Sequence, residues 1–150
     1  FDFDDRSGSI FGGAIQINTD DPYDWTFRFN ERLPLDLTCR GSDSRVDLNM
    51  STTPLRTLDL EADDTDVYLR LGDLQPLVKV SVFGDNTNLR LRVPETAGLK
   101  VLGREFENYL EVIGLKEYED GFISAGFDTM THQIEVRLGD RLSDLSIEIY

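Results

Sequence analysis

The sequence predicts an all-β protein, a short parallel β-helix-like solenoid of about five coils with one insertion. Hydrophobic and polar residues alternate along most of the 150-residue chain, which is typical of β-strands, and helical periodicity is almost absent. The alternating runs recur with a period of about 22 residues, and the same gap separates the two runs of each unit. A fixed period of this length is typical of stacked coils, each too small to bury its apolar side alone.

Four units of the chain each contain two alternating runs. The runs are 35–39 with 46–50, 58–60 with 67–71, 78–82 with 89–93, and 134–138 with 145–149. Leu58 follows Leu37, and Val80 follows Leu58, at this period. The last unit comes after a longer interval. This interval is the same for both runs of the unit, from Val80 to Val136 in the first run and from Leu89 to Leu145 in the second. The last unit therefore keeps its internal register after an insertion.

Stacking would place equivalent residues of successive coils over one another, about 4.8 Å apart. The two inward ladders would be Leu37, Leu58, Val80 and Val136, and Val46, Val67, Leu89 and Leu145. The alternative is an antiparallel β-sandwich made of hairpins, which fits the alternation equally well. Each hairpin would need a six-residue turn, longer than the usual length of about two to five residues, so the spacing favours the solenoid.

The whole chain, residues 1–150, is expected to form one domain. Residues 1–32 contain a looser, aromatic-rich copy of the repeat, which we expect to form an N-terminal coil or cap. Residues 99–133 break the pattern and are expected to be an insertion that covers the core or caps the stack; residues 104–112 have the spacing of a short helix. The run 145–150 is then expected at a solenoid end, where its free strand edge could support a homodimer.

The composition excludes several classes of protein. The chain has 29 Asp and Glu residues against 15 Lys and Arg, a net charge of −14, which excludes a general nucleic-acid binder. Cys39 is the single cysteine, so there is no internal disulfide, and its inward position predicts a core residue. His132 is the single histidine, and no Gly-x-Ser-x-Gly motif supports a nucleophilic triad around it. We therefore expect no enzymatic activity.

The turns between the paired runs are rich in carboxylates. Asp63, Asp64, Asp66 and Asp85 lie in two consecutive turns, so stacking would bring them close together. Carboxylates at such spacing repel one another unless they are hydrated, protonated or bridged by a cation. One interpretation is a Ca²⁺ site, since calcium prefers oxygen ligands. The other is a solvated acidic edge built from turn-forming residues, with no cofactor at all.

Three arginines align on the outward positions of the second runs. Arg70 and Arg92 are equivalent in successive units, and Arg90 lies two residues before Arg92. One interpretation is simple pairing with charges on neighbouring rungs. The other is a local basic patch on an otherwise acidic body, which could bind and orient a partner.

Several short motifs resemble the toast-rack domain of bacterial envelope proteins. They are VDLNMS, LDLEADDTDVYLRL, Val93-Pro94, the Gly121-Phe122 loop and the closing HQIEVRLGDRLSDLSIEIY, and the match covers about residues 33–150. That family includes predicted adhesins and the soluble C-terminal part of LiaF-type envelope-stress regulators. The resemblance implies a right-handed fold, no catalytic motif, and a soluble domain attached to membrane segments that are absent from this chain.

Together these patterns predict a non-catalytic interaction or sensory domain of a membrane-anchored cell-envelope protein. Its partner would be a protein of the envelope or a signalling module. The alternatives are an adhesin-like or carbohydrate-binding module and, least supported, a polysaccharide-active enzyme. Exposed aromatic rings in a groove would favour sugar binding, a flat charged face would favour a protein partner, and two close carboxylates in a cleft would favour the enzyme.

Overall fold

The computed structural model describes residues 7–10, 13–19, 26–29, 32–103, 108–112, 114–139 and 141–150, and the side chains of 32–103, 114–139 and 141–150. These residues contain no α-helix, and one short 3₁₀ turn, η1, covers Phe127–Thr129. The strands are β1 (Ser7–Ile10), β2 (Gly13–Thr19), β3 (Thr26–Phe29), β4 (Leu35–Ser42), β5 (Arg45–Met50), β6 (Leu55–Asp63), β7 (Asp66–Leu71), β8 (Leu77–Phe83), β9 (Thr87–Val93), β10 (Ala97–Leu102), β11 (Asn108–Val112), β12 (Leu115–Tyr118), β13 (Gly121–Ser124), β14 (His132–Leu138) and β15 (Leu142–Ile149).

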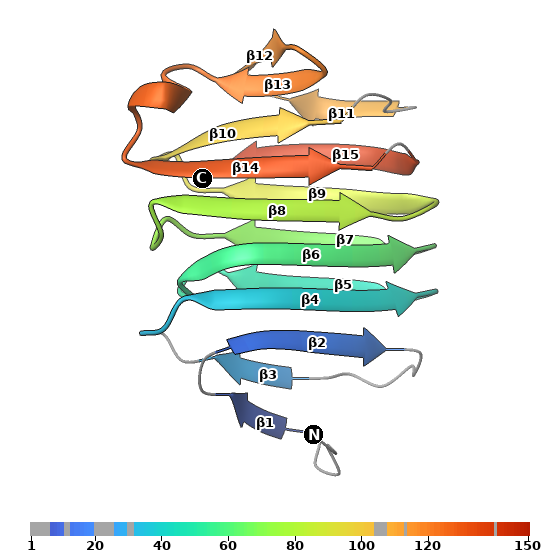
Figure 1. Cartoon of the computed structure of the whole chain (residues 1–150). Coiled ribbons are helices and arrows are strands. Elements are labelled where there is room, and N and C mark those ends of the chain that lie inside the picture. The colour runs from blue at the N-terminus through green and yellow to red at the C-terminus, as the bar shows by residue number, and fades with distance from the viewer. Residues whose placement is uncertain are drawn as a thin grey trace.

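Two facing sheets run along the axis of the stack (Figure 1). One has eight strands in the order β12-β13-β10-β14-β8-β6-β4-β2, and the other has five in the order β11-β15-β9-β7-β5. Neighbours are parallel except around β13, which is antiparallel to both β10 and β12. Each coil from β4 to β15 supplies one strand to each of these two sheets, which confirms the β-helix-like solenoid and rules out the antiparallel sandwich. In the N-terminal coil, β2 joins the eight-stranded sheet, whereas β3 pairs in parallel with β1 in a separate two-stranded sheet.

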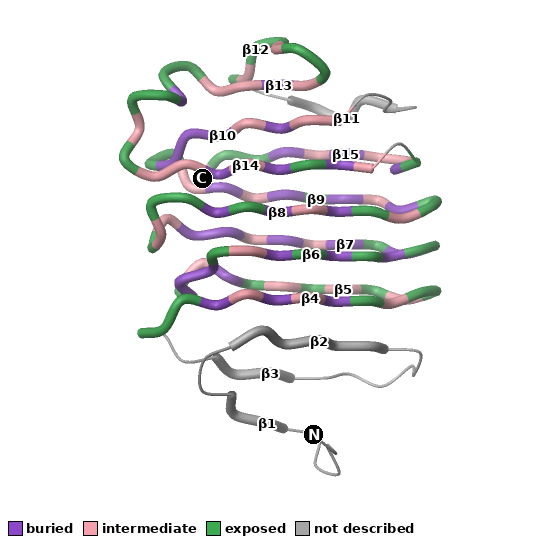
Figure 2. The backbone as a smooth tube through the Cα atoms, viewed as in Figure 1, coloured by how far each residue is buried: buried purple, intermediate pink, exposed green. Residues whose placement is uncertain are grey.

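The predicted ladders are present in register. Leu58 lies beside Leu37 on one side and Val80 on the other, and Val80 in turn lies beside Val136. In the second sheet Val46, Val67, Leu89 and Leu145 are lateral neighbours in that order. Burial therefore alternates along each strand, as Figure 2 shows for β4 to β9.

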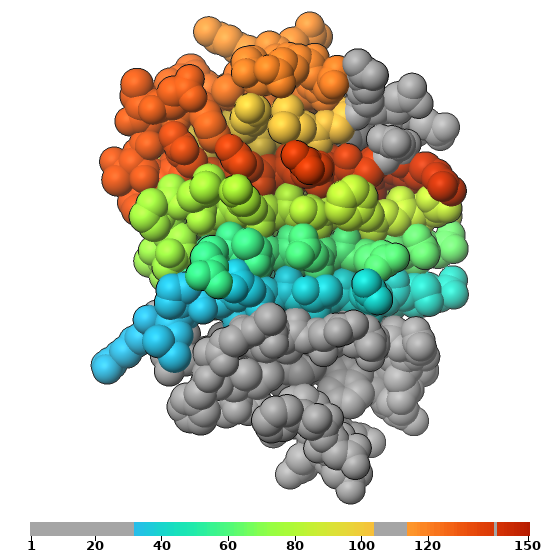
Figure 3. All heavy atoms as spheres, in the orientation of Figure 1, coloured from blue at the N-terminus to red at the C-terminus, as the bar shows by residue number. Residues whose placement is uncertain are grey.

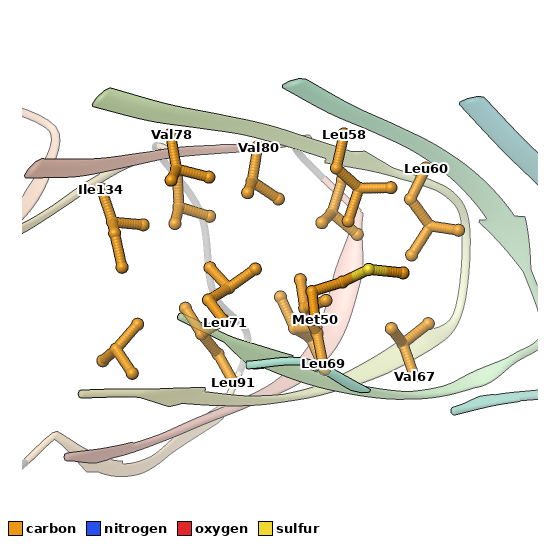
Figure 4. Close-up of a cluster of buried hydrophobic side chains, with 14 of the residues drawn as sticks. Met50, Leu58, Leu60, Val67, Leu69, Leu71, Val78, Val80, Leu91 and Ile134 are labelled. Carbon is orange, nitrogen blue, oxygen red and sulfur yellow. The ribbon is translucent and has the colours of Figure 1, made fainter. Parts of the chain in front are cut away.

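The core is the apolar layer between the two sheets (Figure 4). Leu58 and Leu60 of β6 point toward Val67 and Leu69 of β7, and all four side chains are at most 1% exposed. Cys39 is also buried in this layer, as predicted, and burial raises the pKa of its thiol to about 12.

The C-terminal coil does not lie at an end of the stack. Strand β14 lies between β8 and β10, and β15 lies between β9 and β11. Figure 3 shows this as a red band between the yellow-green and yellow ones. The expectation that the run 145–150 has a free edge for a homodimer is therefore wrong, because both edges of β15 are paired.

The segment expected as an insertion contributes strands to the same two sheets. Its β10 pairs with β14 and its β11 with β15, so the predicted helix at 104–112 is wrong for residues 108–112. The hairpin β12–β13 then extends the eight-stranded sheet at the edge of β10. Only glycine fits at Gly121, because a Cβ atom there would lie 2.0 Å from the carbonyl oxygen of Val101.

At the other end, β2 continues the eight-stranded sheet, with Ile15 beside Leu37 and Ile17 beside Cys39. The first run of the looser N-terminal copy thus keeps the backbone register of the repeat, whereas its second run, in β3, pairs with β1 and not with β5. The aromatic cap expected for residues 1–32 lies outside the residues whose side chains the structure describes.

Candidate functional site

The turns between paired strands stack on one another through backbone contacts. Asp43, Asp64 and Asn86 occupy the same place in successive turns and have φ angles of 49°, 49° and 52°. Asn and Asp tolerate this left-handed conformation better than most residues. The amide of Asp43 donates to the carbonyl of Asp63 (3.1 Å), and that of Asp64 to the carbonyl of Asp85 (2.9 Å). The polar residues of the turns therefore have a structural role.

The predicted calcium ligands are also engaged in this turn ladder. Asp63 accepts from the backbone amide of Asp85 (2.8 Å), and Asp85 accepts from Arg141 (2.7 Å). Asp64 accepts from the side-chain amide of Asn86 (2.7 Å), and Asp66 from that of Asn88 (2.8 Å). No group of three or more potential metal-ligating side chains forms within the part of the chain that the structure describes. Calcium binding here stays a prediction that this geometry does not favour.

The three predicted arginines come together on the outer face of the five-stranded sheet. Arg70 of β7 lies beside Arg92 of β9, and Tyr68 lies beside Arg90. They border a concave region of about 620 Å³, which we call the arginine pocket. Its lining residues are Asp47, Asn49, Tyr68, Leu69, Arg70, Arg90, Leu91, Arg92, Ser146 and Glu148. The basic patch predicted from the alignment of the repeats is thus a single recessed surface.

Two tyrosine rings hold the arginine side chains. The Arg90 guanidinium lies 5.2 Å from the centre of the Tyr68 ring, and Arg45 lies 4.4 Å from the same ring. Arg70 and Arg92 lie 4.2 and 5.3 Å from the ring of Tyr150. Such cation–π contacts contribute about 0.5–1 kcal/mol each at exposed sites. They fix where the guanidinium groups point.

Tyr150 is itself anchored at the rim of the pocket. Its hydroxyl donates to the backbone carbonyl of Leu71 (2.8 Å), and its amide donates to the carbonyl of Val93 (3.0 Å). Its own carbonyl accepts from the amide of Glu95 (2.8 Å). These contacts hold the ring against the two central strands, β7 and β9.

Much of the hydrogen-bonding capacity of the arginines is unused. Arg92 pairs with Glu148 at 2.8 Å, whereas Arg70 and Arg90 form no ion pair or hydrogen bond with any side chain that the structure describes. The Nε atoms of Arg70 and Arg92 are shielded from solvent and also lack a hydrogen-bond partner among these residues. The guanidinium groups of Arg70 and Arg90, although stacked on tyrosine rings, therefore keep N–H donors that no described side chain accepts.

Glu148, Ser146 and Tyr150 are site residues that the sequence analysis missed. The interval from Arg92 to Glu148 is the same as the interval from Leu89 to Leu145. Applied to the outward positions, that interval would have placed Glu148 beside Arg92. No comparable signal exists for Tyr150, because its position depends on how the chain turns beyond β15.

The two carboxylates of the arginine pocket give no support to glycosidic cleavage. Asp47 and Glu148 lie on β5 and β15, with β7 and β9 between them. Three strand spacings are about 14 Å, whereas paired catalytic carboxylates lie about 5 to 9.5 Å apart. His132 is not part of this pocket: it lies at the start of β14 in the eight-stranded sheet, with its Nδ1 atom 3.1 Å from the carbonyl oxygen of Gln75.

Comparison with known proteins supports the fold. No protein-family model and no curated protein matches the chain. A crystal structure from Clostridium sporogenes, described as a "putative cell adhesion protein", superposes with a TM-score of 0.73 at 18% sequence identity. The match covers 81% of this chain and 58% of that structure. Among the described residues, no helix has the length and apolar character needed to cross a membrane.

Proposed function

We propose that this chain is a non-catalytic binding domain of a bacterial cell-envelope protein, of the toast-rack type, and that the full protein is anchored in the membrane. Its role is to present the arginine pocket to a protein partner, for adhesion or for sensing. The name of the structural neighbour is consistent with this role, and so is the resemblance of the repeat motifs to envelope proteins.

The observation that carries the proposal is the arginine pocket on a rigid surface. Strands β7 and β9 are each paired on both sides within the five-stranded sheet. Their inward side chains Val67, Leu69, Leu89 and Leu91 are at most 1% exposed. The backbone that carries the arginines therefore has little freedom to lose on binding, which reduces the entropic cost of association.

A carbohydrate-binding role is the second candidate, because two tyrosines lie at the pocket. Sugar rings bind to proteins by stacking on exposed aromatic faces, but Tyr68 and Tyr150 already carry guanidinium groups over their rings. A sugar would have to displace these groups to stack there. The unpaired charge of Arg70 and Arg90 is available without such a change, which favours an acidic protein partner.

The test is a ligand search with matched variants. The wild-type domain is screened against a displayed library of random peptides and against a glycan array. The pocket variant carries Arg70→Ala, Arg90→Ala and Arg92→Ala, and the control variant carries Lys79→Ala and Arg137→Ala. Both control residues are exposed on the outer face of the eight-stranded sheet.

We expect the wild type and the control to select peptides that the pocket variant does not bind. Selection of glycans that depends on the arginines would instead support the carbohydrate-binding module. If no peptide or glycan depends on the arginines, the proposed role of the pocket is wrong. Circular dichroism and thermal unfolding of each variant check that the substitutions leave the fold intact.

A further inference from the structure

The arginine pocket is a small basic area enclosed by carboxylates. Most of its positive charge lies on the two central strands, with Arg70 on β7 and Arg90 and Arg92 on β9. Arg45 of β5 adds a guanidinium group at one corner, over the Tyr68 ring and 3.8 Å from the carboxylate of Asp47. Asp47 of β5 borders the pocket on one side, and Glu148 of β15 on the other. Apart from this corner, the basic area is two strands wide, about 5 Å from one row of side chains to the next.

Further carboxylates close the pocket toward the turns. Asp66 of β7, Asn88 of β9 and Asp144 of β15 are lateral neighbours in that order, and Arg45 of β5 lies next to Asp66. The two aspartates line a smaller hollow that continues from the pocket past Tyr68 and Arg90. At the opposite end the ring of Tyr150 covers Arg70 and Arg92. The positive area thus meets carboxylates on three sides, with Arg45 at one corner, and an aromatic ring on the fourth.

This charge pattern selects the size of the ligand. A long polyanion would extend beyond the basic area onto Asp47, Glu148 and the acidic turns, and the chain as a whole carries a net charge of −14. Like charges placed together across an interface oppose binding, so both effects disfavour such a ligand. A single compact anion fits between the borders, and positive groups on either side of it would face the bordering carboxylates.

Glu148 already shows how a carboxylate binds in the pocket. Its Oε1 atom accepts a hydrogen bond from Nη2 of Arg92 at 2.8 Å, and more than half of the Glu148 side chain is exposed. An ion pair this exposed is weak and easily exchanged. An incoming carboxylate can therefore take the place of Glu148 on Arg92 and also reach the unpaired Arg70 beside it.

We infer that the arginine pocket recognises one Asp or Glu side chain of a protein partner, in a segment that carries basic residues on either side of it. Glu148 then competes with this carboxylate for Arg92. This inference rests on the proposed function, since it specifies the ligand of the same surface.

The experiment is an NMR titration with two short peptides, Lys-Ser-Glu-Ser-Lys and Lys-Ser-Gln-Ser-Lys, both acetylated at the N-terminus and amidated at the C-terminus so that the Glu side chain is the single carboxylate. The reporters are the backbone amides of β7 and β9 and the Nε–Hε groups of Arg70 and Arg92, whose shielding from solvent slows hydrogen exchange. We expect the Glu peptide, but not the Gln peptide, to shift these signals. Glu148→Gln should tighten binding about two- to fivefold. Arg92→Ala should weaken binding at least about tenfold.

The control variant is Glu135→Gln, on the outer face of the eight-stranded sheet beside Lys79 and Lys100. It should leave the affinity unchanged. Equal shifts with the two peptides, or an unchanged affinity of Glu148→Gln, would overturn the inference. Tighter binding of poly-glutamate or of phosphatidylglycerol vesicles would overturn it too, because the ligand would then be a polyanion or a membrane.

Analytical ultracentrifugation of the free domain tests whether a second copy of the chain binds in the pocket. Self-association that is lost in Arg90→Ala would make a second copy of the chain the ligand and would overturn the inference. The proposed function can survive its failure: peptides from the library that need the arginines but contain no acidic residue would leave the binding role standing. If no library peptide needs the arginines, the proposed function itself fails.

Discussion

Replacing Leu58 with alanine should be among the most damaging changes in the molecule. Leu58 is fully buried and lies between Leu37 and Val80, facing the second sheet across the core. The substitution removes three carbon atoms, worth about 2.4 kcal/mol of lost burial at about 0.8 kcal/mol per carbon. The cavity that remains adds to this cost.

The stacked architecture determines how large the cavity term is. Backbone hydrogen bonds hold β4, β6 and β8 at a fixed spacing, so Leu37 and Val80 have little freedom to move into the space. We therefore expect a total near the upper part of the observed range for such substitutions, about 4 kcal/mol. For a domain of this length, that corresponds to a fall in melting temperature of about 12 °C.

The assay is thermal and urea unfolding followed by circular dichroism. The matched control is Leu77→Ala, because Leu77 lies at the start of β8 and is 36% exposed. It should cost less than about 1 kcal/mol. Equal destabilisation by the two substitutions would refute the reasoning, because a tightly packed ladder position must be more sensitive than a half-exposed strand end.

Three further predictions concern titratable groups. Hydrogen bonds from Arg56 and Thr57 lower the pKa of Asp36 from 3.8 to about 2, so the stability that this carboxylate contributes is present above pH 3.8 and is lost as the pH falls toward 2. Because Arg56 is largely exposed, the loss should be about 1 kcal/mol at most, and acid unfolding of Asp36→Asn should lack it; the same pH profile in both proteins would contradict this. Burial raises the pKa of the Cys39 thiol to about 12, so a disulfide reagent at mildly alkaline pH should modify it only when the chain unfolds. Rapid modification of the native protein would place Cys39 outside the core. Millimolar Ca²⁺ should leave the melting temperature unchanged, because the carboxylates of Asp63 and its neighbours are already hydrogen-bonded; a site filled at 100 times its Kd would add about 2.7 kcal/mol to the free energy of unfolding, and a saturable rise of that kind would establish calcium binding.

The repeat allowed the ladders to be predicted, because each strand of a parallel stack must match its neighbour residue by residue. The pairs Leu58–Val80 and Val80–Val136 follow directly from the intervals between equivalent positions of the units. The same intervals brought Arg70 and Arg92 together on the outer face. In such a fold, the repeat intervals predict which residues are neighbours on the surface as well as in the core.

The order of the coils could not be predicted in the same way. Leu99 and Val101 of β10 alternate as Val78 and Val80 of β8 do, so β14 matches either strand equally well. Only the three-dimensional path of the chain shows that β10 passes beyond β14 and leaves room for it. The prediction of a helix at 104–112 was wrong over β11 for a related reason: apolar spacing in a short segment does not reveal that β15 is available for pairing.

The position of the C-terminal coil is the central claim, because Glu148 and Ser146 border the arginine pocket only if β15 lies beside β9. The most direct test is a methyl–methyl NOE experiment on protein labelled at Ile, Leu and Val. The methyl groups of Ile134 should show NOEs to both Val78 and Leu99, its neighbours on β8 and β10. Strong NOEs directly between Val78 and Leu99, with none from Ile134 to either residue, would contradict the arrangement of the coils and of the pocket with it.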